Sequence, residues 1–197
     1  MVDPARDIAE GKILARRATA LGRDDPTALW SGGFALAYLA GEVETGAAHV
    51  ERALVLNPNA AAAWDVSGWL RIYLGHPDEA IECFARAMRL SPLDSFFYFG
   101  CTGTAFAHIC ARRFGEAATW AIRATHEQSN WAATWRIAAI AYVLCGRMAE
   151  AQAAIARMRE IDPDLRISTY LPITSPFRRS EDRDLCIEAL QQAGLPV

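Results

Sequence analysis

The sequence lacks the features that mark several large classes of protein. Lys12 is the only lysine, and 23 acidic residues outweigh 20 basic ones, which gives a net charge of −3. This charge argues against an extended surface for nucleic acid. No apolar run reaches the roughly 18 residues that a membrane-spanning helix needs. The longest run, residues 137–145, is half that length and is flanked by Arg136 and Arg147.

Cysteine is scarce and shows no metal-ligand spacing. The chain has five cysteines and no Cys-x-x-Cys pair. An odd count without that spacing fits reduced thiols in the cytoplasm better than a disulfide framework or a zinc site. Asp3 and Asp7 stand where a secretory signal peptide would have a basic start and an apolar stretch. We therefore expect a cytoplasmic protein.

Catalytic and cofactor motifs are also missing. The four histidines lie in different parts of the chain, and none has a histidine three or four residues away, so we expect no bound metal ion. There is no Gly-x-Ser-x-Gly, no glycine-rich phosphate loop and no His-Glu-x-x-His. We therefore predict that the chain is not an enzyme and binds no cofactor. The catalytic alternative, an active site around Asp65, Arg136 and Cys110, has no motif to support it.

The residues that are abundant indicate helices. Alanine, the strongest helix former, makes up nearly a fifth of the chain. Runs of Val, Ile and Thr that would favour strands are few. The composition therefore predicts an all-α protein.

The sequence repeats itself with a period of 34 residues. Trp30 and Trp64 are 34 residues apart, as are Pro58 and Pro92, and Trp64 and Trp135 are separated by two periods plus three residues. The three extra residues fall between the second and third units. Fixed periods of this length indicate stacked supersecondary units. We predict four of them, at residues 27–60, 61–94, 98–131 and 132–165.

These units resemble the tetratricopeptide (TPR) repeat. The second unit carries the pattern best, with Trp64, Gly68, Gly75, Ala80, Phe84, Ala87 and Pro92. The third is degenerate, since Cys101 and His108 replace the usual aromatic residues, and it leaves the geometry of the third turn open. The resemblance implies a right-handed α-solenoid of helix–turn–helix repeats forming a single TPR domain over residues 1–197.

Both ends of the array depart from the repeat. Residues 5–22 predict an amphipathic helix with Ile8, Leu14 and Leu21 on one face, equivalent to the second helix of an incomplete repeat. Because a terminal repeat needs a cover for its apolar face, we expect either an upstream domain of the same polypeptide or a second copy of the chain, which would form a homodimer. Residues 166–197 predict a C-terminal cap that ends in a helix.

The family resemblance places the first helix of each repeat on the concave side. Three inward aromatics lie outside the positions that the fold itself uses for its core, so we predict an apolar groove that binds a protein or peptide partner. The alternative is that the chain's own C-terminal segment or a neighbouring domain fills this groove. If the groove is open, replacing Trp69 and Tyr73 with alanine should weaken partner binding and leave the fold intact. The predicted groove residues are Tyr38, Asp65, Trp69, Tyr73, Phe106, Arg136 and Ile140.

A narrower resemblance concerns the joining and tail segments. Residues 90–94, the insertion that follows them, and the tail segments 176–182 and 193–196 resemble the C-terminal TPR regions of bacterial class III adenylate cyclases and of winged-helix regulators. This resemblance implies the regulatory part of a larger signalling protein. The alternative is a stand-alone soluble TPR adaptor or homo-oligomeric scaffold. An upstream cyclase or winged-helix domain in the reading frame would decide between them.

Overall fold

The computed structural model describes residues 4–170 and 176–196, and all regular elements in these ranges are helices. The all-α prediction is therefore confirmed. The elements are α1 (Pro4–Leu21), α2 (Pro26–Ala40), α3 (Val43–Leu56), α4 (Ala61–Leu74), α5 (Pro77–Leu90), α6 (Phe97–Cys110), α7 (Phe114–Glu127), α8 (Ala132–Leu144), α9 (Met148–Ile161), α10 (Ile167–Tyr170) and α11 (Ser180–Gln192).

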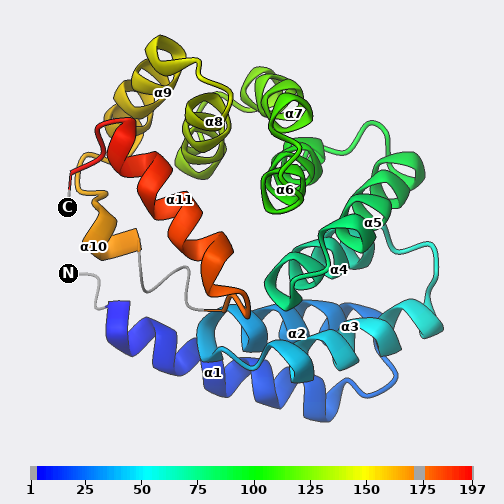
Figure 1. Cartoon of the computed structure of the whole chain (residues 1–197). Coiled ribbons are helices and arrows are strands. Elements are labelled where there is room, and N and C mark those ends of the chain that lie inside the picture. Colours follow the sequence, from blue (N-terminus) through cyan, green and yellow to red (C-terminus); the bar gives the residue numbers. More distant parts are fainter. Residues whose placement is uncertain (1–3, 171–175, 197) are drawn as a thin grey trace.

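Successive helices form antiparallel hairpins that stack side by side in a curved array (Figure 1). The hairpins are α2–α3, α4–α5, α6–α7 and α8–α9; α4–α5 and α8–α9 lie inside the predicted ranges 61–94 and 132–165, and α2–α3 and α6–α7 begin one residue before the predicted ranges 27–60 and 98–131. The first helices α2, α4, α6 and α8 lie on the inner, concave side of the array. The division of the chain into repeats at those boundaries stays a prediction.

Glycine makes the close approach of the backbones possible. A Cβ on Gly33 would lie 2.7 Å from the carbonyl oxygen of Gly46 in the partner helix of the same hairpin. The fully buried ring of Phe84 takes up the space beside Gly68 and Gly103, where a Cβ would lie 2.6 Å and 2.3 Å from ring atoms. One aromatic ring therefore joins the second hairpin to the third.

The turn inside each hairpin uses a left-handed backbone conformation. Gly41, Gly75 and Gly146 occupy this position with φ of 71°, 86° and 75°. In the degenerate third hairpin the same place is taken by Arg112, with φ of 61°. A side chain in this conformation costs about 1–2 kcal/mol, whereas glycine adopts it freely. The third turn therefore keeps the geometry of the others in spite of its sequence.

Helix α1 packs on α2 through small residues. Ala15 and Thr19 are buried there, and a Cβ on Gly32 of α2 would lie 2.7 Å from the Thr19 methyl group. Leu14 and Leu21, on the face predicted to need a cover, are 55% and 76% exposed. The chain itself therefore leaves these two leucines uncovered, and the homodimer stays a prediction.

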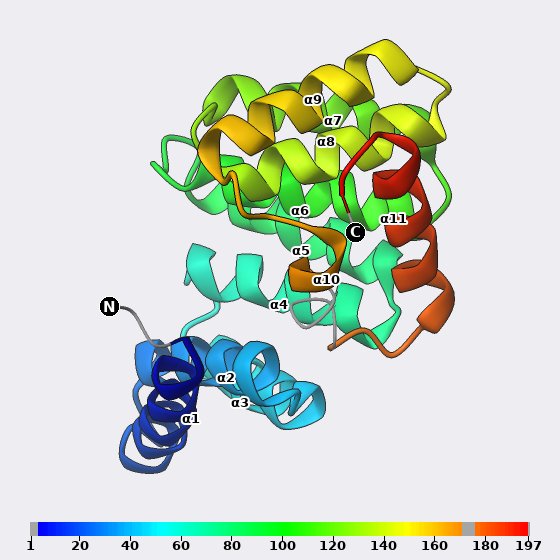
Figure 2. The same ribbon diagram turned by 90° about the vertical axis from the view of Figure 1, so that its left-hand side faces the viewer.

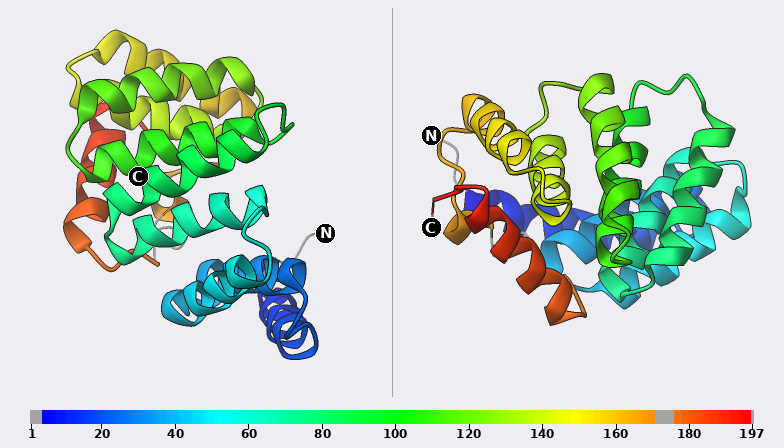
Figure 3. Two further views of the ribbon diagram at one scale, coloured as in Figure 1. Left: turned by 90° about the vertical axis from the view of Figure 1, so that its right-hand side faces the viewer. Right: turned by 45° about the horizontal axis from the view of Figure 1, so that its top comes forward.

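The C-terminal segment returns to the concave side. Helix α11 packs against α8 and extends toward α4, as two views of the molecule show (Figures 2 and 3). The backbone N–H of Ile167 in α10 donates to the carbonyl of Pro196 beyond α11, at 2.8 Å, which ties the two ends of this segment together. The predicted capping helix is thus present. No helix in the described ranges combines the length and hydropathy needed to span a bilayer.

Candidate binding site on the concave face

A continuous series of aromatic rings lines the concave face. Trp131, before α8, lies 5.9 Å from Phe99, and Phe99 lies 5.2 Å from Trp69, measured between ring centroids. Trp69 is in turn 6.1 Å from Phe106, and Phe106 is 5.5 Å from Phe177 in the C-terminal segment. These separations are typical of favourable aromatic pairs. The series links two halves of the face that differ in what covers them.

The first half, which we call the closed half, is covered by residues 176–182. Phe177 packs edge-on against Tyr73 and Phe106, at 5.4 Å and 5.5 Å. The backbone N–H of Arg178 donates to the carbonyl of Tyr73 at 2.9 Å, and its Nε donates to Glu44 Oε1 at 2.7 Å. The hydrogen bonds from Arg178 lower the pKa of the Glu44 carboxyl. The concave face therefore binds a non-helical segment of its own chain.

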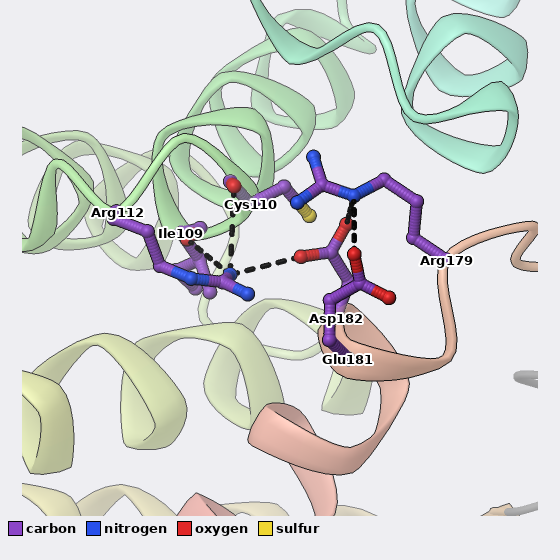
Figure 4. Close-up of polar contacts among 6 residues, drawn as sticks. All are labelled: Ile109, Cys110, Arg112, Arg179, Glu181 and Asp182. Carbon is purple, nitrogen blue, oxygen red and sulfur yellow. Dashed lines mark hydrogen bonds and ion pairs between the residues drawn. The ribbon is translucent and has the colours of Figure 1, made fainter.

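Buried Asp182 anchors this segment (Figure 4). The residue is 1% exposed, and its Oδ1 lies 2.9 Å from Arg112 Nη1 while its Oδ2 lies 3.4 Å from Arg179 Nε. Two guanidinium groups therefore compensate one buried carboxylate. Arg112 is the residue that replaces glycine in the third turn, so its side chain makes a contact in the closed half that glycine could not make. In the sequence, paired arginines and paired acidic residues are typical of solvated turns and helix caps. The sequence therefore gave no sign of the contact between Arg112 and Asp182.

The closed half corrects part of the groove prediction. Trp69, Tyr73 and Phe106 are 7%, 5% and 4% exposed, and Ile140 is fully buried. The expectation that the three aromatics lie outside the core is wrong, because the C-terminal segment covers Tyr73 and Phe106 and Trp69 packs between the rings of Phe84 and Phe99. The occupant that the sequence left open, the chain's own C-terminal segment, is the one found.

The second half, which we call the open half, holds a cavity of about 490 Å³. Its wall comes from the N-terminal halves of α2, α4 and α6 and from the segments that precede α6 and α8. Six of its residues are aromatic and two are acidic, and none of the described residues that line it is Lys, Arg or His. The lining residues are Trp30, Phe34, Ala62, Asp65, Val66, Asp94, Phe96, Tyr98, Phe99 and Trp131.

Asp65, in the first turns of α4, dominates the electrostatics of the open half. Its Oδ1 is buried and makes no hydrogen bond. Burial, and next the nearby charge of Asp94, raise the pKa of Asp65 to about 7. Gly100 makes room for the carboxyl group, since a Cβ there would lie 2.9 Å from Oδ1. The site therefore holds a carboxyl group that lacks a counter-ion within the wall of the cavity.

The other predicted groove residues lie near the boundary of the two halves. Tyr38 of α2 stacks on Phe34 at 5.9 Å and is 39% exposed. Burial raises the pKa of Tyr38, and the charge of Arg136 on α8 opposes that rise. Tyr38 and Arg136 therefore both face the inside of the array.

The alternative active site does not assemble. Cys110 is buried beneath α11, where the groups that act on it are Cys186, Asp182, Arg112 and Arg179, and burial raises the pKa of its thiol well above the usual value. Asp65 instead lines the open half with Asp94. A thiol with a raised pKa is a poor nucleophile. Among the described residues, no three His, Cys, Asp or Glu side chains gather in a way that would hold a metal ion.

A larger cavity of about 820 Å³ lies on the outer side, between α3, α4 and α5. Three of its charged groups, Glu51, Arg71 and Glu79, are paired with one another. Arg71 lies 2.9 Å from both Glu51 and Glu79, and the guanidinium of Arg86 lies 4.3 Å from the ring centre of Trp64. Because its central cation, Arg71, already has two carboxylate partners, this cavity makes a weaker binding site than the open half.

Comparison with known proteins identifies the fold. No protein-family model matches the sequence, and no curated protein sequence matches it significantly. Among solved structures, PilW, a widely conserved type IV pilus biogenesis factor, superposes with a TM-score of 0.71 at 17% identity, over 94% of this chain and 84% of PilW. TTC0263, a thermophilic TPR protein of Thermus thermophilus, gives 0.65 at 17% identity, over 85% of this chain and 91% of its own.

A third similar structure has a described ligand site. YrrB, a TPR protein with an unusual peptide-binding site, gives a TM-score of 0.56 at 19% identity, over 91% of this chain and 90% of YrrB. At these identities the similarity establishes the fold alone. The chain is an all-α solenoid with the tetratricopeptide fold. The predicted fold is thereby confirmed.

Proposed function

We propose that the protein is a non-catalytic interaction module whose concave face binds a peptide segment of a protein partner. The observation that carries this proposal is the contact that the face makes with residues 176–179 of its own chain. Phe177 fits against two rings, and the Arg178 main chain and side chain are both bound. A surface that holds one peptide by side-chain pockets and backbone hydrogen bonds has the chemistry to hold another.

The open half is where the partner binds. It keeps an aromatic cavity of about 490 Å³, whereas the closed half is filled. Of the predicted groove residues, Asp65 lines this cavity, Tyr38 stacks on Phe34 of its wall, and the charge of Arg136 acts on Tyr38. We assign these three residues to partner contact, and Trp69, Tyr73, Phe106 and Ile140 to the support beneath it.

The wider setting remains as the sequence predicts it. The proposal includes a cytoplasmic location and a place in the regulatory region of a larger bacterial signalling protein, such as an adenylate cyclase. The three structures compared above are not described as cyclases, so this link rests on the tail segments alone. The alternative is a stand-alone adaptor or a homo-oligomeric scaffold, favoured by the exposed Leu14 and Leu21 on α1.

Selection from a random peptide library tests the proposal. Peptides enriched on the wild-type protein should lose binding to Trp131→Ala, in the open half, and keep binding to Trp64→Ala, in the outer cavity. Circular dichroism verifies that both variants are folded. If the enriched peptides depend on Trp64 and not on Trp131, or if no peptide is enriched, the concave face is not the binding surface.

A further inference from the structure

We propose that the open half recognises an arginine side chain of the partner peptide, with the guanidinium group held between aromatic rings and paired with the carboxylates of Asp65 and Asp94. This inference rests on the proposed function and specifies the chemistry of the partner. The cavity, its aromatic wall and its uncompensated acidic groups point to this one class of ligand.

The charge of the cavity is complementary to that of an arginine side chain. Asp65 and Asp94 both line the cavity, and no basic residue is among the described residues of its wall. Elsewhere the fold gives a buried acidic group arginine partners, as Asp182 has Arg112 and Arg179. A buried carboxyl group without a counter-ion is costly, and a cation from outside would remove that cost.

The aromatic wall of the cavity also suits a guanidinium group. Aromatic faces attract cations, and the planar guanidinium group stacks on them while its fork of N–H groups matches a carboxylate. Among the described residues, three arginines already lie over an aromatic ring, at 4.3, 4.7 and 4.8 Å from the ring centre. The pairs are Arg86–Trp64, Arg123–Phe97 and Arg147–Tyr142.

The closed half already binds an arginine that follows an apolar residue. There the protein binds its own Phe177 and Arg178, the phenylalanine against rings and the arginine against Glu44. The open half offers the same combination of rings and carboxylates, with Asp65 set deeper in the wall and Asp94 exposed at its edge. An arginine next to an apolar residue therefore suits both halves of the face.

The test uses N-acetyl-arginine amide as the probe and N-acetyl-citrulline amide, which has the same shape without the charge, as its control. Binding is followed by NMR through the indole signals of Trp30 and Trp131. Arginine amide should shift both signals in a saturable way, and citrulline amide should bind at least tenfold more weakly. Equal binding of the two compounds would overturn the proposal.

Three variants locate the charge. Asp65→Asn should weaken arginine binding at least tenfold, Asp94→Asn at least threefold, and Asp24→Asn, in the exposed loop before α2, should bind like the wild type. Unchanged binding by both Asp65→Asn and Asp94→Asn would show that the carboxylates do not hold the ligand. If Asp65→Asn failed to fold, the exposed Asp94 would still carry the test.

The peptide selection separates this inference from the proposed function. Peptides that bind through Trp131 but show no enrichment of arginine, and that tolerate Asp65→Asn, would refute the arginine site and leave the binding module standing. Binding of arginine amide in the cavity without enrichment of any peptide would refute the peptide-binding function and leave the arginine site standing. Enriched peptides in which arginine is required, and replaceable by citrulline only with loss of binding, support both.

Discussion

The closed and open halves of the concave face share helices α4 and α6 and differ in how their charges are satisfied. In the closed half, buried Asp182 has two arginine partners and Phe177 fills the space between Tyr73 and Phe106. In the open half, Asp65 lacks a cationic partner and the rings surround a cavity. The closed half therefore stabilises the fold, whereas the open half retains an unfavourable group, as binding sites commonly do.

The largest effect is expected at Trp69, where the two halves meet. Trp69→Ala removes a ring that is 7% exposed and that packs on Tyr73, Phe84, Phe99 and Phe106. We expect the free energy of unfolding to fall by about 3–5 kcal/mol, measured by chemical denaturation. Trp131→Ala, in the open half, should cost clearly less. Equal losses would mean that the two halves are equally part of the core.

Asp182→Asn should destabilise the closed half. The substitution keeps the shape of the side chain and removes the charge that Arg112 and Arg179 share. Because both arginines are more than a third exposed and can be hydrated, we expect a loss of about 1–3 kcal/mol and faster proteolysis before α11. Glu181→Gln is the matched control, since the Glu181 side chain is 56% exposed and its pairing is screened by solvent, so this variant should be clearly more stable than Asp182→Asn. A control that is as unstable as Asp182→Asn would contradict the anchoring role.

Asp65→Asn should do the opposite and stabilise the protein at high pH. The folded-state pKa of about 7 lies above the ordinary value of 3.8, so the folded protein holds a proton that the unfolded chain has lost between these pH values. Stability therefore falls as the pH rises from about 4 to 7, and the penalty is complete above pH 7. Removing the charge should add about 2–4 kcal/mol at pH 8 and nothing near pH 3.

The measurement is the free energy of unfolding against pH for the variant and the wild type. The titratable groups that face Asp65 are Asp94 in the α5–α6 loop and Tyr98 and Cys101 on α6. Burial raises the pKa of Cys101 to about 12, so its thiol stays neutral over this range. Asp24→Asn should show no such pH-dependent gain. A variant that is less stable than the wild type at pH 8 would show that Asp65 has a partner.

The smallest effect separates two roles of Arg112. Arg112→Ala loses the contact with Asp182 and keeps a side chain in the left-handed conformation, whereas Arg112→Gly loses the contact and relieves that conformation. The glycine variant should therefore be about 1 kcal/mol more stable than the alanine variant. Gly146→Ala, at the equivalent turn with open space around it, should cost about the same amount. Equal stabilities of the two Arg112 variants would contradict the backbone argument.

The sequence predicted what the repeat dictates. The 34-residue spacing of Trp30 and Trp64, and of Pro58 and Pro92, was enough to predict an all-α solenoid of helix–turn–helix hairpins. Asp65 was also predicted as a groove residue, because the repeat places it on an inward turn of α4. Local periodicity determines which face a side chain takes, so these predictions needed no knowledge of distant parts of the chain.

Contacts between residues far apart in the sequence were beyond that reasoning. Glu44 and Arg178 are 134 residues apart, and Phe177 reaches Tyr73 across the array. The repeat pattern carries no information about where the C-terminal segment packs. It therefore predicts an open surface at Trp69, Tyr73 and Phe106. The loop residues Asp94, Phe96 and Trp131 were missed for a similar reason, because they lie between helices, outside the positions that the repeat defines.

The division of the concave face into a closed and an open half is tested most directly by the solvent exposure of its tryptophans. Labelling with 5-fluorotryptophan gives one ¹⁹F signal for each of the six tryptophans, and a soluble gadolinium complex broadens those that solvent reaches. The account predicts strong broadening for Trp30 and Trp131 and little for Trp69. Broadening of Trp69 equal to that of Trp131 would contradict it, because the rings of Phe84 and Phe99 would then leave Trp69 open to solvent.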